Sequence, residues 1–261
     1  MSSLSCYNNV KRGNDGNRPS SAPYAHLVSI NVDTSGSMSS FQGTQATQIH
    51  KTLAVLKEVA ISSNVMTLVS IWTFDGYAKN PVEPFDIRSQ ELPTLSELQT
   101  YFSPGGMTAL YDSSKACVEQ LVDMKKKFIS ELPNSLRLIN PDIKATYYLL
   151  TDGEDTASEP NGRKKCIIAM RNARKNHGVM DIFLGANIDA KTTATSMGFS
   201  GHAYQMASTS AGCAKMMKTV TSILRQTSQG SSEPYEPASF DPPSPPSPLK
   251  GISLRPMLRR Y

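Results

Sequence analysis

The stretch LVSINVDTSGSM, residues 27–38, decides the fold of this chain. A short apolar run that ends on a carboxylate is typical of a buried strand followed by a loop. The loop leaves the strand at its carboxyl end, where open α/β sheets place their ligands. Asp33, Ser35 and Ser37 offer only oxygen atoms, and hard cations such as Mg²⁺ prefer oxygen ligands. The stretch therefore predicts a central strand with a cation site at its end.

Two distant stretches strengthen this prediction, because Asp and Ser alone are also common in ordinary turns. Residues 103–112, SPGGMTALYD, place the Thr108 hydroxyl after a Gly-Gly loop and just before a helical pattern. Residues 146–155, TYYLLTDGED, are a second apolar strand that ends on Asp152. Three loops can therefore supply oxygen ligands at one edge of the same sheet.

These residues resemble the metal-ion-dependent adhesion site of the von Willebrand factor A domains. That site uses Asp-x-Ser-x-Ser, a distant Thr and a distant Asp, and the matching residues here are Asp33, Ser35, Ser37, Thr108 and Asp152. The resemblance covers about residues 25–226. Residues 181–190, DIFLGANIDA, are similar to a branch of the family found in bacteria, phages and large DNA viruses.

The resemblance implies a bound Mg²⁺ or Mn²⁺. The hydroxyls of Ser35, Ser37 and Thr108 would reach the ion, with Asp33 and Asp152 acting through water. It also implies a non-enzymatic interaction module, in which an Asp or Glu of a protein partner completes the coordination of the ion. Two alternatives stay open. The ion can simply tie three loops together, or the chain can be a structural component of a viral particle or other large assembly, such as a minor capsid protein.

Length and composition suit one domain with two flanking segments. The chain has 261 residues with 39% apolar content, which predicts a domain over residues 24–226, an N-terminal arm over 1–23 and a C-terminal tail over 227–261. The net charge of +5 is modest and does not indicate a nucleic-acid partner. The sequence contains no run of about 18 apolar residues, so it predicts no membrane span.

The four cysteines indicate an intracellular protein. Cys6, Cys117, Cys166 and Cys213 show no paired spacing, so they are expected to be isolated thiols in a reducing compartment. The N-terminus lacks the apolar core of a signal peptide. A cytoplasmic location is therefore expected, with a virion as the alternative.

Alternating strand and helix patterns predict a doubly wound, mainly parallel α/β sheet flanked by helices, which is a Rossmann-like fold. Strands are expected at residues 25–33, 65–74, 77–85 (an edge strand), 146–150, 179–184 and 202–206. Helices are expected at residues 45–62, 95–102, 110–129, 162–176, 191–197 and 208–226, the last of them capped by Ser208 or Ser210. In the third helix Ala116, Leu121, Met124 and Phe128 should face inward.

Two basic runs are interpreted as solvated helix faces rather than phosphate-binding patches. One is Lys125 to Lys127, and the other is the set of cations between Arg163 and Lys175. The methionines Met216 and Met217 are expected to fill the core.

The proline-rich tail is expected to lie outside the core, because prolines lack the N–H donor that a helix or sheet interior requires. Seven prolines fall between Pro234 and Pro248, and a basic end with Leu254 and Tyr261 follows. Residues 227–261 are interpreted either as an arm that docks on assembly neighbours or as a disordered solubilising tail.

No pattern in the chain indicates catalysis. A phosphotransferase of the haloacid dehalogenase type needs a second Asp where Ser35 stands. Neither a Gly-x-Ser-x-Gly elbow nor a phosphate-binding Gly-Lys-Ser/Thr loop is present. His26, His50, His177 and His202 are isolated in the sequence and lack a partner motif.

Overall fold

A computed structural model describes residues 23–200 and 202–230. The predicted N-terminal arm up to residue 22, with Cys6, and the tail beyond Gly230 lie outside the described residues. The described chain contains a six-stranded sheet in the order β3-β2-β1-β4-β5-β6. Every neighbouring pair is parallel except β2 and β3. The strands are β1 (Ala25–Asp33), β2 (Met66–Phe74), β3 (Ala78–Asp86), β4 (Ile143–Thr151), β5 (Val179–Ala186) and β6 (His202–Met206).

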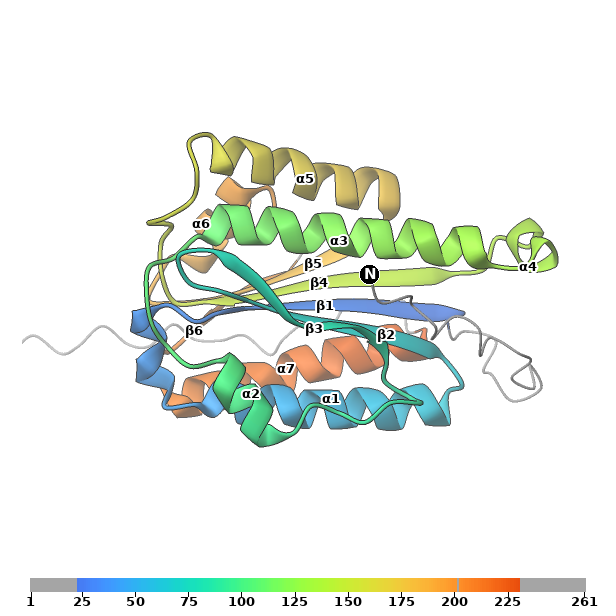
Figure 1. Ribbon diagram of the computed structural model, residues 1–261, viewed down its shortest axis with the longest axis horizontal. Coiled ribbons are helices and arrows are strands. Elements are labelled where there is room, and N and C mark those ends of the chain that lie inside the picture. Colours follow the sequence, from blue (N-terminus) through green and yellow to red (C-terminus); the bar gives the residue numbers. More distant parts are fainter. Residues whose placement is uncertain (1–22, 201, 231–261) are drawn as a thin grey trace, which may run out of the picture.

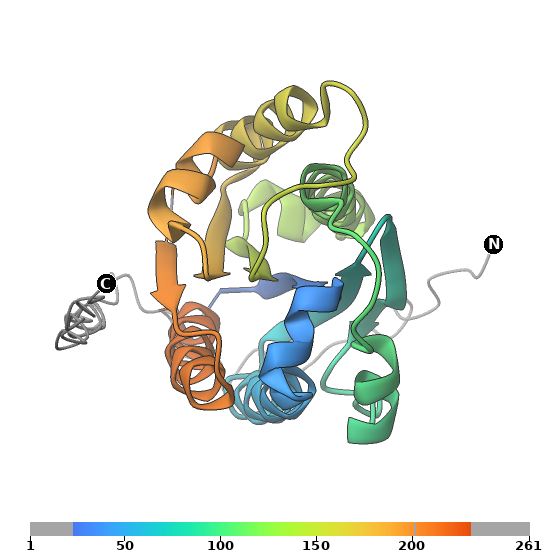
Figure 2. The same ribbon diagram turned by 90° about the vertical axis from the view of Figure 1, so that its left-hand side faces the viewer.

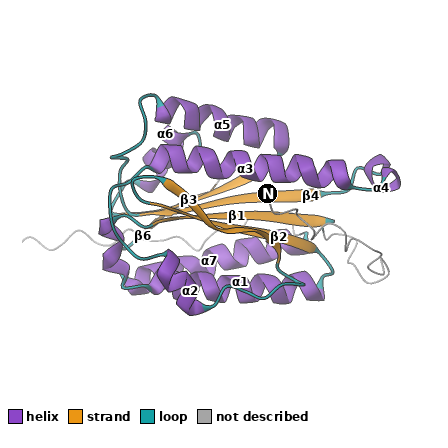
Figure 3. Ribbon diagram, viewed as in Figure 1, coloured by secondary structure: helices purple, strands orange, loops and turns teal. Residues whose placement is uncertain are grey.

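Helices cover both faces of this sheet, as the sequence predicts for a doubly wound α/β fold (Figures 1 and 3). Helices α3, α5 and α6 lie on one face, and α1, α2 and α7 lie on the other. Their bounds are η3 (Gly36–Phe41, a 3₁₀ helix), α1 (Thr44–Ser62), α2 (Leu95–Tyr101), α3 (Leu110–Glu131), α4 (Asn134–Leu138), α5 (Gly162–His177), α6 (Ala190–Met197) and α7 (Ser210–Gln229).

The central strand β1 is buried along its whole length because helices pack on both of its faces. Val28, Ile30 and Val32 join the apolar cluster under α1 and α7, while Ala25 and Leu27 join the cluster under α3 and α5. This alternation follows from the period of two along a strand. A strand covered on both sides is apolar in nearly every position, which is why residues 27–32 identify it so clearly.

The predicted edge strand and the second helix are both confirmed. β3 is the antiparallel edge of the sheet, and its Pro81 and Pro84 are tolerated there because an edge strand needs fewer ladder donors. α2 begins at a complete capping box between Thr94 and Glu97. Met216 and Met217 lie in the core, as expected.

The end and the cap of the last helix were predicted wrongly. α7 is capped by Thr209, whose hydroxyl accepts a hydrogen bond from the Gly212 N–H, and the helix continues to Gln229 rather than ending at Gln226. Ser228 in its last turn is fully buried. The sequence does not predict this turn, because Thr227, Ser228 and Gln229 are all polar and show no apolar residue at helical spacing.

Three details of the α3 region also differ from expectation. Ala116 is only half-buried, and Cys117 takes the inward position beside it. Lys125 is not solvated like Lys126 and Lys127, because its ammonium donates to the His177 carbonyl at 2.8 Å. The short helix α4 was not predicted, and none of its residues is buried.

The parallel register brings the carboxyl ends of β1, β2 and β4 to one edge. Asp33 is level with Phe74 of β2, and Val32 is level with Leu150 of β4. Figure 2 looks onto this edge, with η3 and the loop that follows β4 facing the viewer. Within the described residues, no helix combines the length and apolarity that crossing a membrane requires.

Candidate metal centre

The loop before α3 is fastened to the loop after β1 by backbone hydrogen bonds. The Gly105 N–H donates to the Thr34 carbonyl at 2.8 Å, and the Gly36 N–H donates to the Gly106 carbonyl at 3.3 Å. Gly106 has φ +74°, and a Cβ there would lie 3.3 Å from the Asp75 Cβ. The Gly-Gly pair therefore allows a close approach that a larger residue would oppose.

Thr108 is held by the loop that follows β4. Its N–H donates to the Thr156 hydroxyl at 2.9 Å, and its carbonyl accepts from the Thr156 N–H at 2.8 Å. On its other side, the Ala109 N–H donates to the Asp75 carbonyl at 2.6 Å. The backbone of Thr108 is therefore anchored to two other loops, and the residue is 6% exposed.

Asp33 is held on both carboxylate oxygens. Oδ1 accepts from the Ser35 N–H at 2.7 Å, which closes a turn at the strand end. Oδ2 accepts from the Thr151 hydroxyl at 2.6 Å, which bridges from β4 to β1. The Asp33 carboxylate is thus oriented before any ligand binds.

The remaining site residues form a chain of oxygen atoms. The hydroxyls of Ser35 and Ser37 lie 3.1 Å apart, and the Ser37 hydroxyl donates to Asp152 Oδ1 at 2.7 Å. A Cβ on Gly153 would lie 3.8 Å from the Ser37 hydroxyl oxygen and 3.7 Å from that of Thr108. All five predicted residues therefore meet at one place.

Both carboxyl groups of the site lack a compensating positive charge. Burial raises the pKa of Asp33, against the hydrogen bonds from Thr151 and Ser35, and the nearby Asp152 raises it further. Burial likewise raises the pKa of Asp152, against the hydrogen bond from Ser37. Among the described residues, neither carboxylate forms an ion pair.

One atom of the site has no partner. Asp152 Oδ2 is buried and accepts no hydrogen bond. A buried acceptor without a partner costs about 1–3 kcal/mol, and more when it is charged. A cation, or a water held by a cation, would satisfy this oxygen, so the donor set fits a divalent ion.

The hydroxyls are essential to that fit. No group of three or more His, Cys, Asp or Glu side chains within residues 23–200 and 202–230 is arranged to hold a metal. An ion at this edge would therefore depend on Ser35, Ser37 and Thr108 as well as on the two acids. Ser37 is the exposed member of the set, so the site opens to solvent on its side.

The sequence reasoning missed the residues that support the site. Thr151 orients Asp33, and Thr156 holds Thr108. Asp155 and Ser158 fasten the same loop to α3, since the Ser158 hydroxyl accepts from the Tyr111 N–H at 3.1 Å and donates to Asp155. The only signal for these residues was their position within six residues of Asp152, and Ser, Thr and Asp are common in any loop.

Comparisons with known proteins support the fold. No family model matches the sequence, and no curated protein matches it by sequence. Among solved structures, the PilB minor pilin from Streptococcus sanguinis is similar with a TM-score of 0.57 and 12% identity, covering 83% of this chain and 65% of that one.

A von Willebrand factor type A protein from Catenulispora acidiphila is similar with a TM-score of 0.51 and 15% identity, over 77% of this chain and 43% of that one. The pilus adhesin SpaC from Lactobacillus rhamnosus GG, in its open conformation, reaches a TM-score of 0.51 and 14% identity, over 80% of this chain and 31% of that one. The chain thus spans less than two thirds of each of these proteins. The likeness supports a fold of the von Willebrand factor A type, while the bacterial and viral branch stays a prediction.

Proposed function

We propose that this chain is a non-enzymatic interaction module that holds Mg²⁺ or Mn²⁺ at the carboxyl edge of its sheet and binds an Asp or Glu of a protein partner there. The observation that carries the proposal is the meeting of Asp33, Ser35, Ser37, Thr108 and Asp152, with two uncompensated carboxylates among them. A bound cation supplies the positive charge that attracts an incoming carboxylate.

The hydroxyl and carboxylate residues of the site have different roles in this proposal. The three hydroxyls are neutral ligands, so they leave a bound cation with charge for a partner to satisfy. Asp33 and Asp152 would act on the ion through water, and the Thr151 hydroxyl orients the Asp33 carboxylate. Because Ser37 is exposed, a partner approaches from its side.

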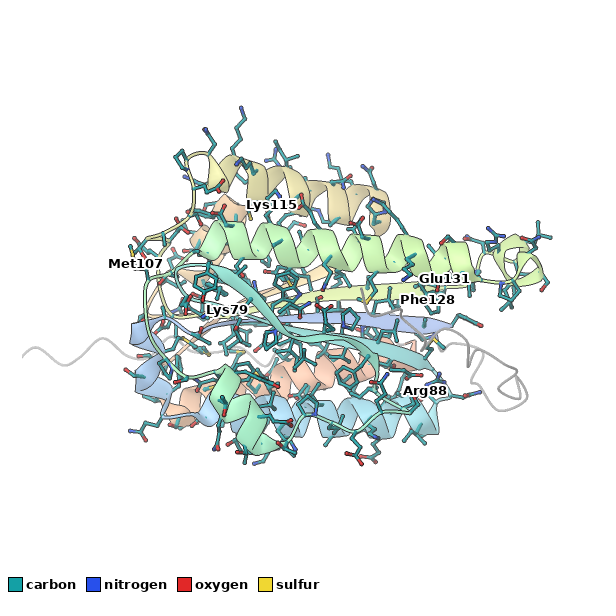
Figure 4. The ribbon with its side chains drawn as sticks, viewed as in Figure 1. Lys79, Arg88, Met107, Lys115, Phe128 and Glu131 are labelled. Atoms are coloured by element: carbon teal, nitrogen blue, oxygen red, sulfur yellow. The ribbon has the colours of Figure 1, made fainter. Side chains whose placement is uncertain are left out.

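The rim of the site carries apolar surface as well. Met107, next to Thr108, is 56% exposed, and Figure 4 shows it at the end of the molecule where the site loops lie. Tyr77 is 64% exposed, and the Lys79 ammonium lies 4.4 Å above its ring centre. A partner acid flanked by an apolar residue matches this rim.

The first experiment measures Mn²⁺ binding by calorimetry in the wild type and in Thr108→Val, which removes one hydroxyl at nearly constant volume. One site is expected in the wild type, with at least tenfold weaker binding in the variant. Ser39→Ala is the matched control, because it removes an exposed hydroxyl of η3 outside the five-residue site. Equal Mn²⁺ affinity in wild type and Thr108→Val would refute the metal centre.

The second experiment asks whether a carboxylate joins the ion. The end-blocked peptide acetyl-Gly-Asp-Gly-amide, whose only carboxylate is the Asp side chain, should tighten Mn²⁺ binding, and by linkage Mn²⁺ should tighten peptide binding by the same factor. Acetyl-Gly-Asn-Gly-amide is the control and should have no effect. If Mn²⁺ binds but neither peptide matters, the ion only ties the three loops together.

The alternative function is a structural part of a larger assembly, such as a viral particle. Two of the similar folds belong to proteins named as a minor pilin and a pilus adhesin, and these names support the alternative. If the chain assembles without the ion, assembly should persist in the Asp33→Ala variant and also in EDTA. If the chain is a metal-dependent interaction module, the substitution and EDTA should each abolish partner capture.

A further inference from the structure

Helix α5 carries a dense positive charge that the metal centre does not use. Its 16 residues include six Lys and Arg side chains and no acid. Two of the six have an acidic partner, since Lys165 lies 3.2 Å from Glu159 and Arg174 lies 3.7 Å from Asp181. The other four form no ion pair within residues 23–200 and 202–230, and they are Arg163, Lys164, Arg171 and Lys175.

The placement of these cations opposes the stability of the helix. The first turn of α5 holds no acid, while Arg163, Lys164 and Lys165 lie in it. The amino-terminal end of a helix carries the positive end of its dipole, so cations are unfavourable there. Arg171 and Lys175 lie four residues apart, where like charges repel each other. The positive charge is therefore present although the fold gains nothing from it, which indicates an anionic partner.

Four exposed side chains form one continuous line on α5, which we call the outer seam, and they are Lys164, Ile168, Arg171 and Lys175. They recur at intervals of four, three and four residues. This spacing keeps side chains on one side of a helix, and it is the spacing with which helices pair in coiled coils. The opposite side of α5, with Cys166 and Met170, packs into the core. Figures 1 and 2 place α5 at the outer edge of the molecule, so the seam faces outward along about 16 Å of helix.

A hollow of about 440 Å³ lies on the amino-terminal half of the outer seam. Its lining comes from α5 and the residue before it, and consists of Asn161, Arg163, Lys164, Ile167, Ile168 and Arg171. Ile168 is 60% exposed and lies between Lys164 and Arg171, about one turn from each. The aliphatic stems of these cations extend the apolar surface of Ile168 and hold their charges at its rim. The seam therefore offers an apolar floor with a cation on each side.

Two other anionic surfaces fit the outer seam less well. Single-stranded nucleic acid binds through aromatic platforms in addition to cations, and the seam has no aromatic side chain. A helix that lies on a membrane inserts an apolar face, whereas the apolar face of α5 is turned into the core. An acidic amphipathic helix matches both features of the seam, because its acids meet the cations while an apolar residue covers Ile168.

We propose that the outer seam of α5 binds an acidic amphipathic helix of a partner protein. An apolar side chain of that helix covers Ile168, and Asp or Glu side chains one turn away on either side pair with Lys164 and Arg171. The seam shares no residue with the five-residue metal centre, so this interaction needs no ion and is independent of the function proposed above.

The test uses the full-length chain and an end-blocked, alanine-based helical peptide. The peptide carries Glu, Leu, Glu and Glu at the spacing of the outer seam. The readout is the shift of the isoleucine δ-methyl signals during a titration with the peptide. The Ile168 signal should shift and saturate, while Ile61 of α1, which is 58% exposed, is the internal control and should stay in place. EDTA should leave the affinity unchanged, because no ion takes part.

Matched variants separate the seam from net charge, with affinities measured by fluorescence anisotropy of the labelled peptide. Lys164→Gln with Arg171→Gln should weaken binding about tenfold. Lys51→Gln with Lys218→Gln makes the same change in net charge at exposed positions of α1 and α7, on the other face of the sheet, and should leave the affinity unchanged. Ile168→Ser should also weaken binding about tenfold, because the apolar contact is lost.

Three results would each overturn the proposal. The first is equal affinity in the seam variant and its charge-matched control. The second is loss of peptide binding in EDTA, because the acids would then bind at the ion instead of the seam. The third is a larger Ile168 shift with oligothymidylate or with phosphatidylserine vesicles than with the peptide, which would make the seam a nucleic-acid or membrane surface.

Discussion

Thr151 shows how a residue that touches no ligand can set the properties of the site. Its hydroxyl donates to Asp33 Oδ2 at 2.6 Å, and this bond is the main effect that opposes the rise in the Asp33 pKa caused by burial. It stabilises the ionised carboxylate that a cation needs. Supporting contacts of this kind orient the groups around a metal and tune their basicity.

Thr151→Val should therefore weaken Mn²⁺ binding by roughly 10–100-fold, the usual effect of losing such a supporting contact. Calorimetry at constant pH measures it. The control is Thr195→Val on α6, where the hydroxyl bonds only its own helix at the Lys191 carbonyl. Unchanged affinity in Thr151→Val would mean that Asp33 does not need this bond.

His26 is a second buried polar residue, and it is structural. Its ring nitrogens lie 2.7 Å from the Ser228 hydroxyl and 2.9 Å from the Thr146 hydroxyl. Burial first, and Lys144 second, lower the pKa of His26 to about 3. The histidine is therefore neutral in the folded chain at pH values where it would be charged in the unfolded chain.

The sign of the pH effect follows from this lowered pKa. The contribution of neutral His26 is fully present above the unfolded pKa of 6.5 and is lost as pH falls toward 3. At pH 5 the loss is about 2 kcal/mol. His26→Gln should remove this part of the acid sensitivity between pH 7.5 and 5 in urea unfolding, while His50→Gln should retain it. Identical pH profiles for wild type and His26→Gln would contradict the assignment.

At the scale of elements, the last turn of α7 joins the helix to the sheet. Ser228 reaches the buried His26 of β1, although residues 226–229 show no apolar pattern. The boundary predicted between residues 226 and 227 therefore falls inside a helical turn. The tail proper is expected to begin after Gly230, where α7 ends in a left-handed residue.

Two truncations test this boundary. A chain that ends at Gly230 should keep the urea midpoint of the full-length protein. A chain that ends at Gln226 should lose about 1–3 kcal/mol, because a buried nitrogen of His26 is left without its partner. Ser228→Ala separates the hydrogen bond from the loss of the helical turn. If ending the chain at Gly230 also destabilises it, the tail contributes to the core.

At the scale of the whole molecule, the proposed ion links three loops from distant parts of the chain. The loops after β1 and β4 and the loop before α3 meet only in the folded protein, so an ion bound there stabilises the folded state. The stabilisation by the ion is weaker at acid pH, because the pKa values of Asp33 and Asp152 are raised and the ion competes with protons for their carboxylates.

Saturating Mg²⁺ should raise the melting temperature, and the gain should grow with pH. Without metal, the protonated carboxyl groups of Asp33 and Asp152 favour folding at acid pH, because their pKa values in the folded chain are raised above the ordinary aspartate pKa of 3.8. This contribution is lost as the pH rises from 3.8 through the raised pKa values. With Mg²⁺ at about 100 times its Kd, a gain of roughly 5–10 °C is expected at pH 7.5. A smaller gain is expected at pH 5.

Asp33→Asn should reduce that gain at both pH values, and scanning calorimetry in Mg²⁺ and in EDTA measures it. The control Ser39→Ala should behave as wild type. A gain that is the same at pH 5 and pH 7.5, or the same in Asp33→Asn, would mean that Mg²⁺ acts elsewhere.

The sequence by itself determined the layered fold and the five candidate ligands. Buried strands such as residues 27–32 are continuously apolar, and helices such as α1 repeat at 3.6 residues, so both leave a local signal. Asp33, Ser35 and Ser37 share one loop, and the resemblance to a known motif joined Thr108 and Asp152 to them.

Only the tertiary structure decided which polar residues support one another. Thr151 and Asp33, Thr156 and Thr108, and Ser228 and His26 are far apart in the chain, and each pair forms because the parallel sheet and its helices bring them together. A hydrogen bond between distant residues has no period and no local composition, so no pattern predicts it. The same is true of the exposed Ile168 between the cations of α5, since exposure is a property of the packed molecule.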